Sequence, residues 1–108
     1  LLESGILDPS KAAALLDSFR HELPARAERI ETAFQQHDRA ALFEATHQLK
    51  GTAGMYGLDN IAEAARTICD HLRADHEWKG LQDSVLRLAD LCRQAAAGDS
   101  GGQTENAS

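Results

Sequence analysis

The sequence predicts an all-α protein: an up-and-down antiparallel four-helix bundle with a short additional helix at its N-terminal end. Apolar residues recur at the three- and four-residue spacing of helices, and no segment alternates with the two-residue period of a half-buried strand. The connections between the expected helices are short, so consecutive helices should run antiparallel.

The first expected helix begins at Asp8-Pro9, because Asp8 can cap a helix and Pro9 suits its first position. Its apolar stripe comprises Ala12, Leu15, Leu16, Phe19 and Leu23. Pro24 then either kinks this helix or starts a new one. The following helix is expected to run to about Gln36, with an inward stripe of Ala27, Ile30, Ala33 and Phe34.

Asp38 is the expected N-cap of the next helix, after a short connection at His37-Asp38. This helix should end where Gly57 suits the left-handed conformation and Leu58 follows as its apolar neighbour. Asp59 is the expected N-cap of a further helix, whose buried stripe is Ile61, Ala65, Ile68 and Leu72. After a connection at about 75–79, the last helix should end near residue 97, with an apolar side of Trp78, Leu81, Val85, Leu88 and Cys92.

The chain divides into three expected segments: a lead-in over residues 1–7, the helical bundle over 8–97, and a disordered tail over 98–108 that is rich in Gly, Ser, Asn and Gln. The first residue is Leu1, which favours a fragment of a longer protein. Cys69 and Cys92 lie on expected apolar faces, so two buried thiols are favoured over a disulfide.

The composition argues against several classes of function. A net charge of -6 does not suit nucleic acid, and aromatic residues make up only 5% of the chain, too few for base-stacking platforms. No apolar run approaches the roughly 20 residues of a membrane-spanning helix, and no signal peptide is visible. We therefore expect a cytoplasmic domain with no direct membrane insertion.

The segment that carries His47 combines a helical pattern with two interior glycines, Gly51 and Gly54. Each glycine inside a helix costs about 1 kcal/mol relative to alanine. A marginally stable small domain has little reason to accept this cost twice in one turn unless another molecule must approach that surface closely.

A helical projection at about 100° per residue places His47 on the exposed side of its helix. The opposite side carries the residues that such a helix would bury, which are Leu42, Ala45, Leu49, Thr52, Ala53 and Tyr56. Gln48 lies at the edge of the exposed face, which holds Ala40, Phe43, Glu44, Lys50, Gly51 and Gly54 around the histidine. This face is typical of a docking surface for a partner that reacts with the histidine.

The residues His47-Gln48-Leu49-Lys50-Gly51-Thr52-Ala53, followed by Gly57 and Ile61, resemble the signature of histidine-containing phosphotransfer (HPt) domains. The resemblance extends over roughly residues 8–97 and implies a four-helix bundle that relays phosphoryl groups between receiver-domain aspartates of two-component systems. It also implies that His47 is the phosphorylated residue, with Lys50 and Gly51 as its characteristic neighbours.

The chemistry of these residues agrees with that implication. A neutral imidazole nitrogen is a ready nucleophile, and phosphoryl transfer depends mainly on alignment and charge compensation, which Lys50 can supply one turn away. We expect Mg²⁺ to belong to the partner receiver and this chain to need no cofactor, because it offers no cluster of oxygen ligands. The residues expected to dock the receiver are Ala40, Phe43, Glu44, Gln48, Gly51 and Gly54.

Three alternatives stay open. The phosphorylatable domain of chemotaxis-type histidine kinases resembles HPt domains but usually has a histidine and a glutamate on the next helix, where the register of this chain gives Arg66 and Cys69. A non-catalytic adaptor would bind receivers without needing the histidine. A di-iron site is suggested by the Glu-x-x-His pair Glu44 and His47, but no second copy exists and the pair points outward.

The histidine is not followed by the acidic residue and proline of autokinase dimerisation domains, and no glycine-rich nucleotide motif is present. We therefore expect a monomeric phosphoryl carrier without an ATP site or autokinase activity. It either stands alone or forms the cytoplasmic C-terminal part of a membrane-bound hybrid sensor kinase.

Overall fold

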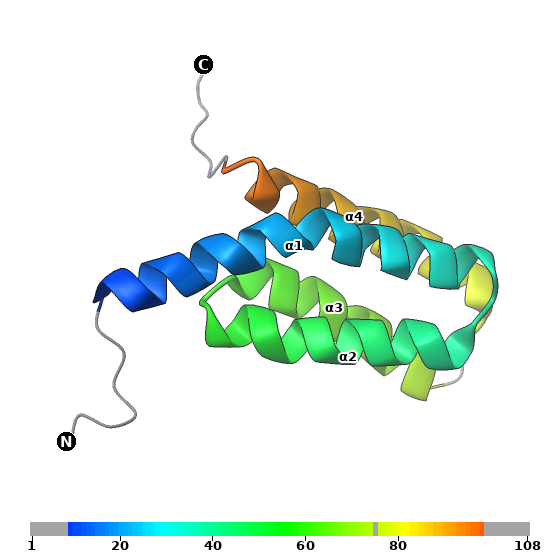
Figure 1. Cartoon of the computed structure of the whole chain (residues 1–108). Coiled ribbons are helices and arrows are strands. Elements are labelled where there is room, and N and C mark those ends of the chain that lie inside the picture. Colours follow the sequence, from blue (N-terminus) through cyan, green and yellow to red (C-terminus); the bar gives the residue numbers. More distant parts are fainter. Residues whose placement is uncertain (1–8, 75, 99–108) are drawn as a thin grey trace, which may run out of the picture.

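The computed structural model describes residues 9–74 and 76–98, and within these ranges it contains helices and no strand (Figure 1). The elements are α1 Pro9–Gln35, α2 Arg39–Met55, α3 Asp59–Arg73, the 3-10 helix η1 Trp78–Leu81 and α4 Gln82–Ala96. Helix α1 packs against α2 and α4, and α3 packs against the same two helices from the other side. The predicted all-α bundle is confirmed.

The expected separate helix before Pro24 is wrong, because α1 runs without a break from Pro9 to Gln35 with Pro24 inside it. A proline inside a helix costs about 3 kcal/mol. Leu23 and Ala27, on either side of Pro24, are fully buried against the other helices, and their burial favours one continuous helix.

The first turns of α1 extend beyond the end of α2, as Figure 1 shows. Three of the five residues predicted to face inward therefore do not reach the core: Ala12 and Leu15 are exposed, and Leu16 is half-buried. Only from Phe19 onward does the apolar stripe of α1 meet the other helices.

Local signals correctly located both ends of α2. The Asp38 carboxylate accepts a hydrogen bond from the Ala41 amide at 3.1 Å, which confirms the predicted N-cap. At the other end Gly57 has φ +78°, and the Leu58 amide donates to the Ala53 carbonyl at 2.9 Å. This is the Schellman arrangement, in which a left-handed residue ends the helix.

The N-cap predicted at Asp59 is wrong. Helix α3 starts at Asp59 itself, and Leu58 occupies the cap position without a side-chain hydrogen bond. Leu58 already closes α2, so the chain enters α3 directly after it. The Asp59 carboxylate lies in the first turn, where it interacts favourably with the helix dipole.

The core is formed by apolar residues from all four α-helices. The predicted stripe of α3 is confirmed, since Ile61, Ala65, Ile68 and Leu72 are all buried. The last helix begins later than predicted, at Gln82, because residues 78–81 form η1 instead. Trp78 in η1 is half-buried, and its Nε1 donates to the Phe34 carbonyl at 3.1 Å.

Cys69 and Cys92 are both buried and free, as predicted. Burial raises the pKa of the Cys92 thiol to about 11, so this side chain is a neutral part of the core.

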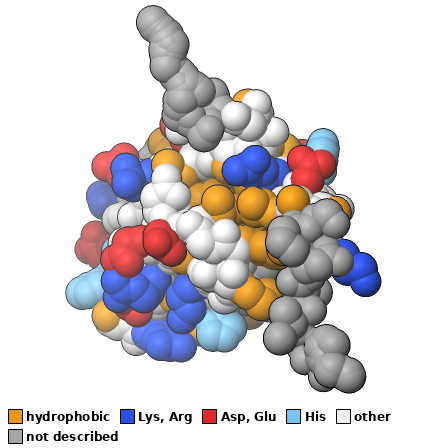
Figure 2. Space-filling model, turned by 90° about the vertical axis from the view of Figure 1, so that its left-hand side faces the viewer, with side chains coloured by type: hydrophobic (Ala, Val, Ile, Leu, Met, Phe, Trp, Pro, Cys, Tyr) orange, Lys and Arg blue, Asp and Glu red, His pale blue; other side chains and the backbone are white. Residues whose placement is uncertain are grey.

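The end of the bundle where α1 begins and α2 ends carries apolar side chains at its surface (Figure 2). Met55 is 75% exposed and Leu15 is 44% exposed, and next to them Phe19 and Tyr56 stack with ring centroids 5.1 Å apart. The expected lead-in, the cap at Asp8 and all of the expected tail except Gly98 lie outside the described residues. In the described part of the chain, no helix is long and apolar enough to cross a membrane.

Candidate functional site

Helix α2 has one buried side and one open side, and His47 lies on the open side. Leu42, Thr46, Leu49 and Ala53 are buried, whereas His47 is exposed, as predicted. The exposed neighbours of the histidine are Ala40, Glu44, Gln48, Gly51 and Gly54.

Five residues of α2 and its C-cap are half-buried, contrary to the projection. Ala45, Thr52 and Tyr56 were expected to be buried, and Phe43 and Lys50 were expected on the exposed face. These residues lie along the two borders of the helix, where the neighbouring helices cover part of each side chain. Tyr56, for example, stacks on Phe19 of α1.

The imidazole of His47 rests on the ring of Phe43, with centroids 5.6 Å apart and planes inclined by 12°. The guanidinium of Arg73, from α3, lies 5.5 Å from the centroid of the same Phe43 ring. Among the described residues, the imidazole of His47 has no hydrogen-bond or ion-pair partner. Its ring is therefore held by stacking while its nitrogens stay available to another molecule.

Two shallow hollows lie on either side of the histidine. The hollow towards α3 has a volume of about 360 Å³ and is lined by Arg39, Ala40, Phe43, Leu72 and Arg73. The hollow towards α1 has a volume of about 240 Å³ and is lined by Arg29, Ala41, Glu44, Ala45 and Gln48. A partner that reaches the imidazole therefore meets recesses on both sides of it.

The glycines beside His47 are not needed by the packing of this chain. Among the residues that the structure describes, a Cβ atom at Gly51 would meet no atom within 4 Å, and one at Gly54 would meet only Ala62 Cβ, at the ordinary contact distance of 4.0 Å. Neither glycine has a positive φ. The observation agrees with the close-approach interpretation, in which the missing side chains serve an external partner.

The two residues that the chemotaxis comparison singled out on the neighbouring helix do not contact His47. Cys69 is buried, and its Sγ lies 3.3 Å from the Thr46 hydroxyl. Arg66 forms ion pairs with Glu63 and Asp70 on its own helix. In this structure, neither side chain orients the imidazole.

The Glu44 and His47 pair is exposed on α2. Over residues 9–74 and 76–98, no group of three or more His, Cys, Asp or Glu side chains is arranged to hold a metal ion.

Sequence reasoning missed three residues that other helices bring to this site, Arg29 from α1 and Leu72 and Arg73 from α3. It also missed Arg39, at the start of α2 itself. Of these residues, only Arg73 could have been found from the sequence, because it lies one turn after Cys69 on the side of α3 that meets α2. Arg39, whose side chain donates to the Leu72 carbonyl, is fixed by a tertiary contact and has no local signature.

An exposed imidazole without a side-chain partner, a lysine one turn away and two glycines beside it are the features expected of a protein module that exchanges a group with a second protein through a histidine. The family model described as Hpt domain matches residues 14–98. The chain therefore belongs to the Hpt domain family, the histidine phosphotransfer modules of phosphorelays, which interact with receiver domains. No curated protein and no solved structure matches the chain.

Proposed function

We propose that His47 accepts a phosphoryl group from the phosphorylated aspartate of one receiver domain and passes it to the aspartate of another. The observation that carries this proposal is the open, unpaired imidazole of His47 beside two glycines that the fold does not need. The family gives the general activity, and the geometry of α2 supports this residue as its centre.

The transfer is a displacement at phosphorus. The unprotonated nitrogen of the neutral His47 ring attacks, an N–P bond forms, and the P–O bond to the receiver aspartate breaks. The aspartate leaves as a carboxylate, and the imidazole keeps the proton on its other nitrogen. The second transfer reverses these bond changes with a different receiver. Charge compensation on this side falls to Lys50, while Mg²⁺ is expected in the receiver.

Docking is proposed to use the open face of α2 together with the two hollows. Gly51 and Gly54 let the receiver's acceptor site come close, and Ala40 and Phe43 provide apolar contact in the hollow towards α3. Glu44 and Gln48 border the hollow towards α1. The guanidinium groups of Arg39 and Arg73 add positive charge to this face, which favours a partner surface of negative charge.

The test is labelling by phosphorylated receivers from the source organism. The protein should gain an acid-labile, base-stable phosphoryl group, and His47→Gln should abolish the label without changing helicity or melting. His21→Gln serves as the matched control, because His21 is also exposed but lies on α1. Full labelling of His47→Gln would refute the assignment.

The same experiment separates a carrier from an adaptor. A non-catalytic adaptor would bind the phosphorylated receiver, for example in a pull-down, and never acquire label itself. Binding that survives His47→Gln while wild-type protein stays unlabelled would therefore overturn the proposal.

A further inference from the structure

Along the seam between α2 and α3, residues of one helix can be matched one by one with residues of the other at the same level. Four residues of α2 lie at helical spacing on the side that faces α3, and three of them can be matched to a residue of α3. The Phe43 ring meets the Arg73 guanidinium at 5.5 Å, and Thr46 Oγ1 meets Cys69 Sγ at 3.3 Å. A Cβ at Gly54 would lie 4.0 Å from Ala62 Cβ. The fourth member of this row is Lys50, between Thr46 and Gly54.

The residue of α3 at the level of Lys50 is Arg66. Cys69 and Arg73 contact α2, Ala62 lies beside Gly54 of α2, and Arg66 lies between Ala62 and Cys69 on the same stripe of α3. Because the two helices run antiparallel, the register places Lys50 opposite Arg66. Two positively charged residues therefore occupy matching positions on the two sides of the seam, one turn along α2 from His47.

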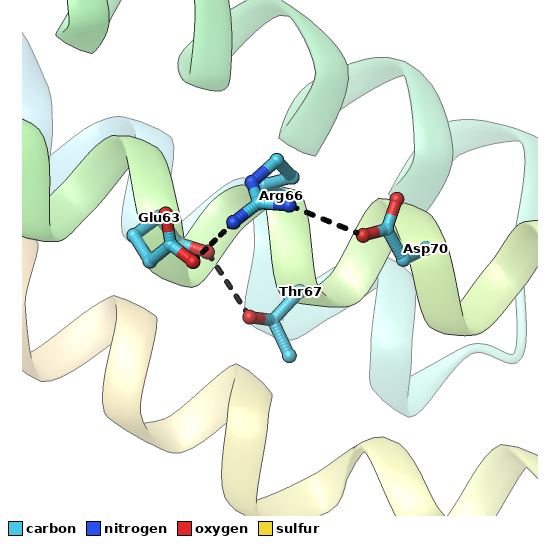
Figure 3. Close-up of polar contacts among 4 residues, drawn as sticks. All are labelled: Glu63, Arg66, Thr67 and Asp70. Carbon is cyan, nitrogen blue, oxygen red and sulfur yellow. Dashed lines mark hydrogen bonds and ion pairs between the residues drawn. The ribbon is translucent and has the colours of Figure 1, made fainter.

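Figure 3 shows how the charge of Arg66 is balanced on its own helix. Its guanidinium contacts the Glu63 carboxylate and lies 3.7 Å from the carboxylate of Asp70. Lys50 differs, because its side chain forms no hydrogen bond or ion pair with any residue that the structure describes. The unmodified protein thus has one cation without a partner among the described residues, one turn along α2 from His47, and one neutralised cation at the matching position of α3.

We propose that Lys50 and Arg66 form a phosphoryl-binding site across the α2–α3 seam. Phosphorylation of His47 draws Arg66 out of its contacts with Glu63 and Asp70 and onto the phosphoryl oxygens. The inference rests on the proposed function of His47 and adds a second cation from a different helix.

The energetics favour this exchange of partners. The Arg66 side chain is 52% exposed, and exposed ion pairs of this kind contribute little to stability, so its contacts on α3 open at small cost. A phosphoryl group brings about two negative charges and three strong acceptor oxygens. The planar guanidinium matches that geometry with two parallel N–H donors, which a lone lysine does not offer.

The experiment measures the equilibrium of phosphoryl exchange between one phosphorylated receiver and this protein. Arg66→Gln should lower the equilibrium constant for formation of phosphohistidine by about three- to tenfold, and Arg66→Lys should recover part of the loss. Arg87→Gln is the matched control, because Arg87 is an exposed arginine on α4 with Asp83 and Asp90 near it in sequence. It should leave the equilibrium unchanged.

A second set of variants tests the exchange of partners. Glu63→Gln combined with Asp70→Asn frees Arg66 in advance and should raise the equilibrium constant by about two- to threefold. Asp83→Asn combined with Asp90→Asn makes the same change of net charge on α4 and should have a smaller effect. When Arg66→Gln is also present, the double change on α3 should raise the equilibrium constant no more than the double change on α4 does. The reason is that Glu63 and Asp70 are expected to influence the phosphoryl group through Arg66.

A readout independent of transfer is the NMR signal of the Arg66 Nε–H group. Phosphorylation should shift it in wild-type protein. Phosphohistidine formation with an unmoved Arg66 signal and an unchanged equilibrium in Arg66→Gln would overturn this inference while leaving the function of His47 intact. Wild-type protein that takes no label at all would instead refute the proposed function.

Discussion

The α1–α4 seam and the α2–α3 seam differ in how charged side chains are paired across them. Across α1 and α4, Arg93 donates to both carboxylate oxygens of Glu31, at 2.8 and 2.9 Å. Across α2 and α3, the register sets Lys50 opposite Arg66, and no acidic residue of either helix bridges them. Opposite charges therefore meet across the α1–α4 seam, whereas two positive charges occupy matching positions across the α2–α3 seam.

The Glu31 and Arg93 pair shows what internal complementarity does to the two groups. The hydrogen bond from Arg93 holds the pKa of the Glu31 carboxyl below its ordinary 4.5, and the same bond raises the pKa of Arg93. Both groups are more firmly charged in the folded protein, as expected for a pair that belongs to the fold. Lys50 has no such partner among the described residues, and Arg66 is paired only within α3, which fits a surface that is completed by another molecule.

The largest effect should come from filling the open surface beside His47. Gly51→Gln is expected to slow phosphoryl transfer at least about tenfold, because its side chain occupies the space that the receiver needs. The same change should stabilise the helix by about 0.5–1 kcal/mol, since no atom of residues 9–74 and 76–98 would meet a Cβ at Gly51. Transfer rates and thermal unfolding check the two parts.

Gly51→Ala is the matched control for that variant. It should stabilise the helix similarly and slow transfer much less, because a methyl group fills less of the surface. Normal transfer in Gly51→Gln would show that the partner does not approach this part of α2.

The next largest effects come from removing one cation at each seam, Lys50 at the α2–α3 seam and Arg93 at the α1–α4 seam. Lys50→Gln should lower the transfer rate by roughly tenfold by removing charge compensation, and leave the free energy of unfolding within about 0.5 kcal/mol. Arg93→Gln should do the reverse: transfer unchanged, and stability lowered by up to about 1 kcal/mol. Paired measurements of transfer and denaturant unfolding test the contrast. Equal effects of the two variants on transfer would contradict it.

The smallest effect concerns pH at the α1–α4 seam. Because the pKa of Glu31 is lowered in the folded protein, its ion pair stabilises the fold above the carboxyl's ordinary pKa of 4.5. This contribution is lost as the pH falls through the lower folded pKa. Glu31→Gln should therefore be less stable than wild type at pH 7, by less than about 1 kcal/mol, and match it in strong acid.

Melting curves of both proteins across the acid range measure this difference. A gap between wild type and Glu31→Gln that persists or widens in strong acid would show that the loss comes from packing and not from the ion pair.

Much of the site could be predicted because it depends on one helix. The angular position of His47, Gly51 and Gly54 follows from helical periodicity once Leu42 and Leu49 are recognised as core residues. The ends of that helix were also predictable, since the Asp38 side chain and the left-handed Gly57 act within a few residues of their position in the sequence.

Predictions failed where a distant element decided the outcome. Pro24 reads locally as an interruption, but burial of Leu23 and Ala27 keeps α1 continuous through it. Leu15 has the spacing of a core residue and remains exposed, because α2 ends before it can cover that turn. Proline and apolar spacing report local preference, whereas burial depends on which other helix is present.

The sequence by itself determined the all-α class, the exposed histidine and the family signature, because each depends on residues within one or two helical turns of each other. Only the tertiary structure decided that Arg39 and Arg73 line a hollow beside that histidine and that Arg66 lies level with Lys50. Those relations depend on the register between helices, which is set by the packing of whole apolar stripes and is not encoded in the spacing of any single helix.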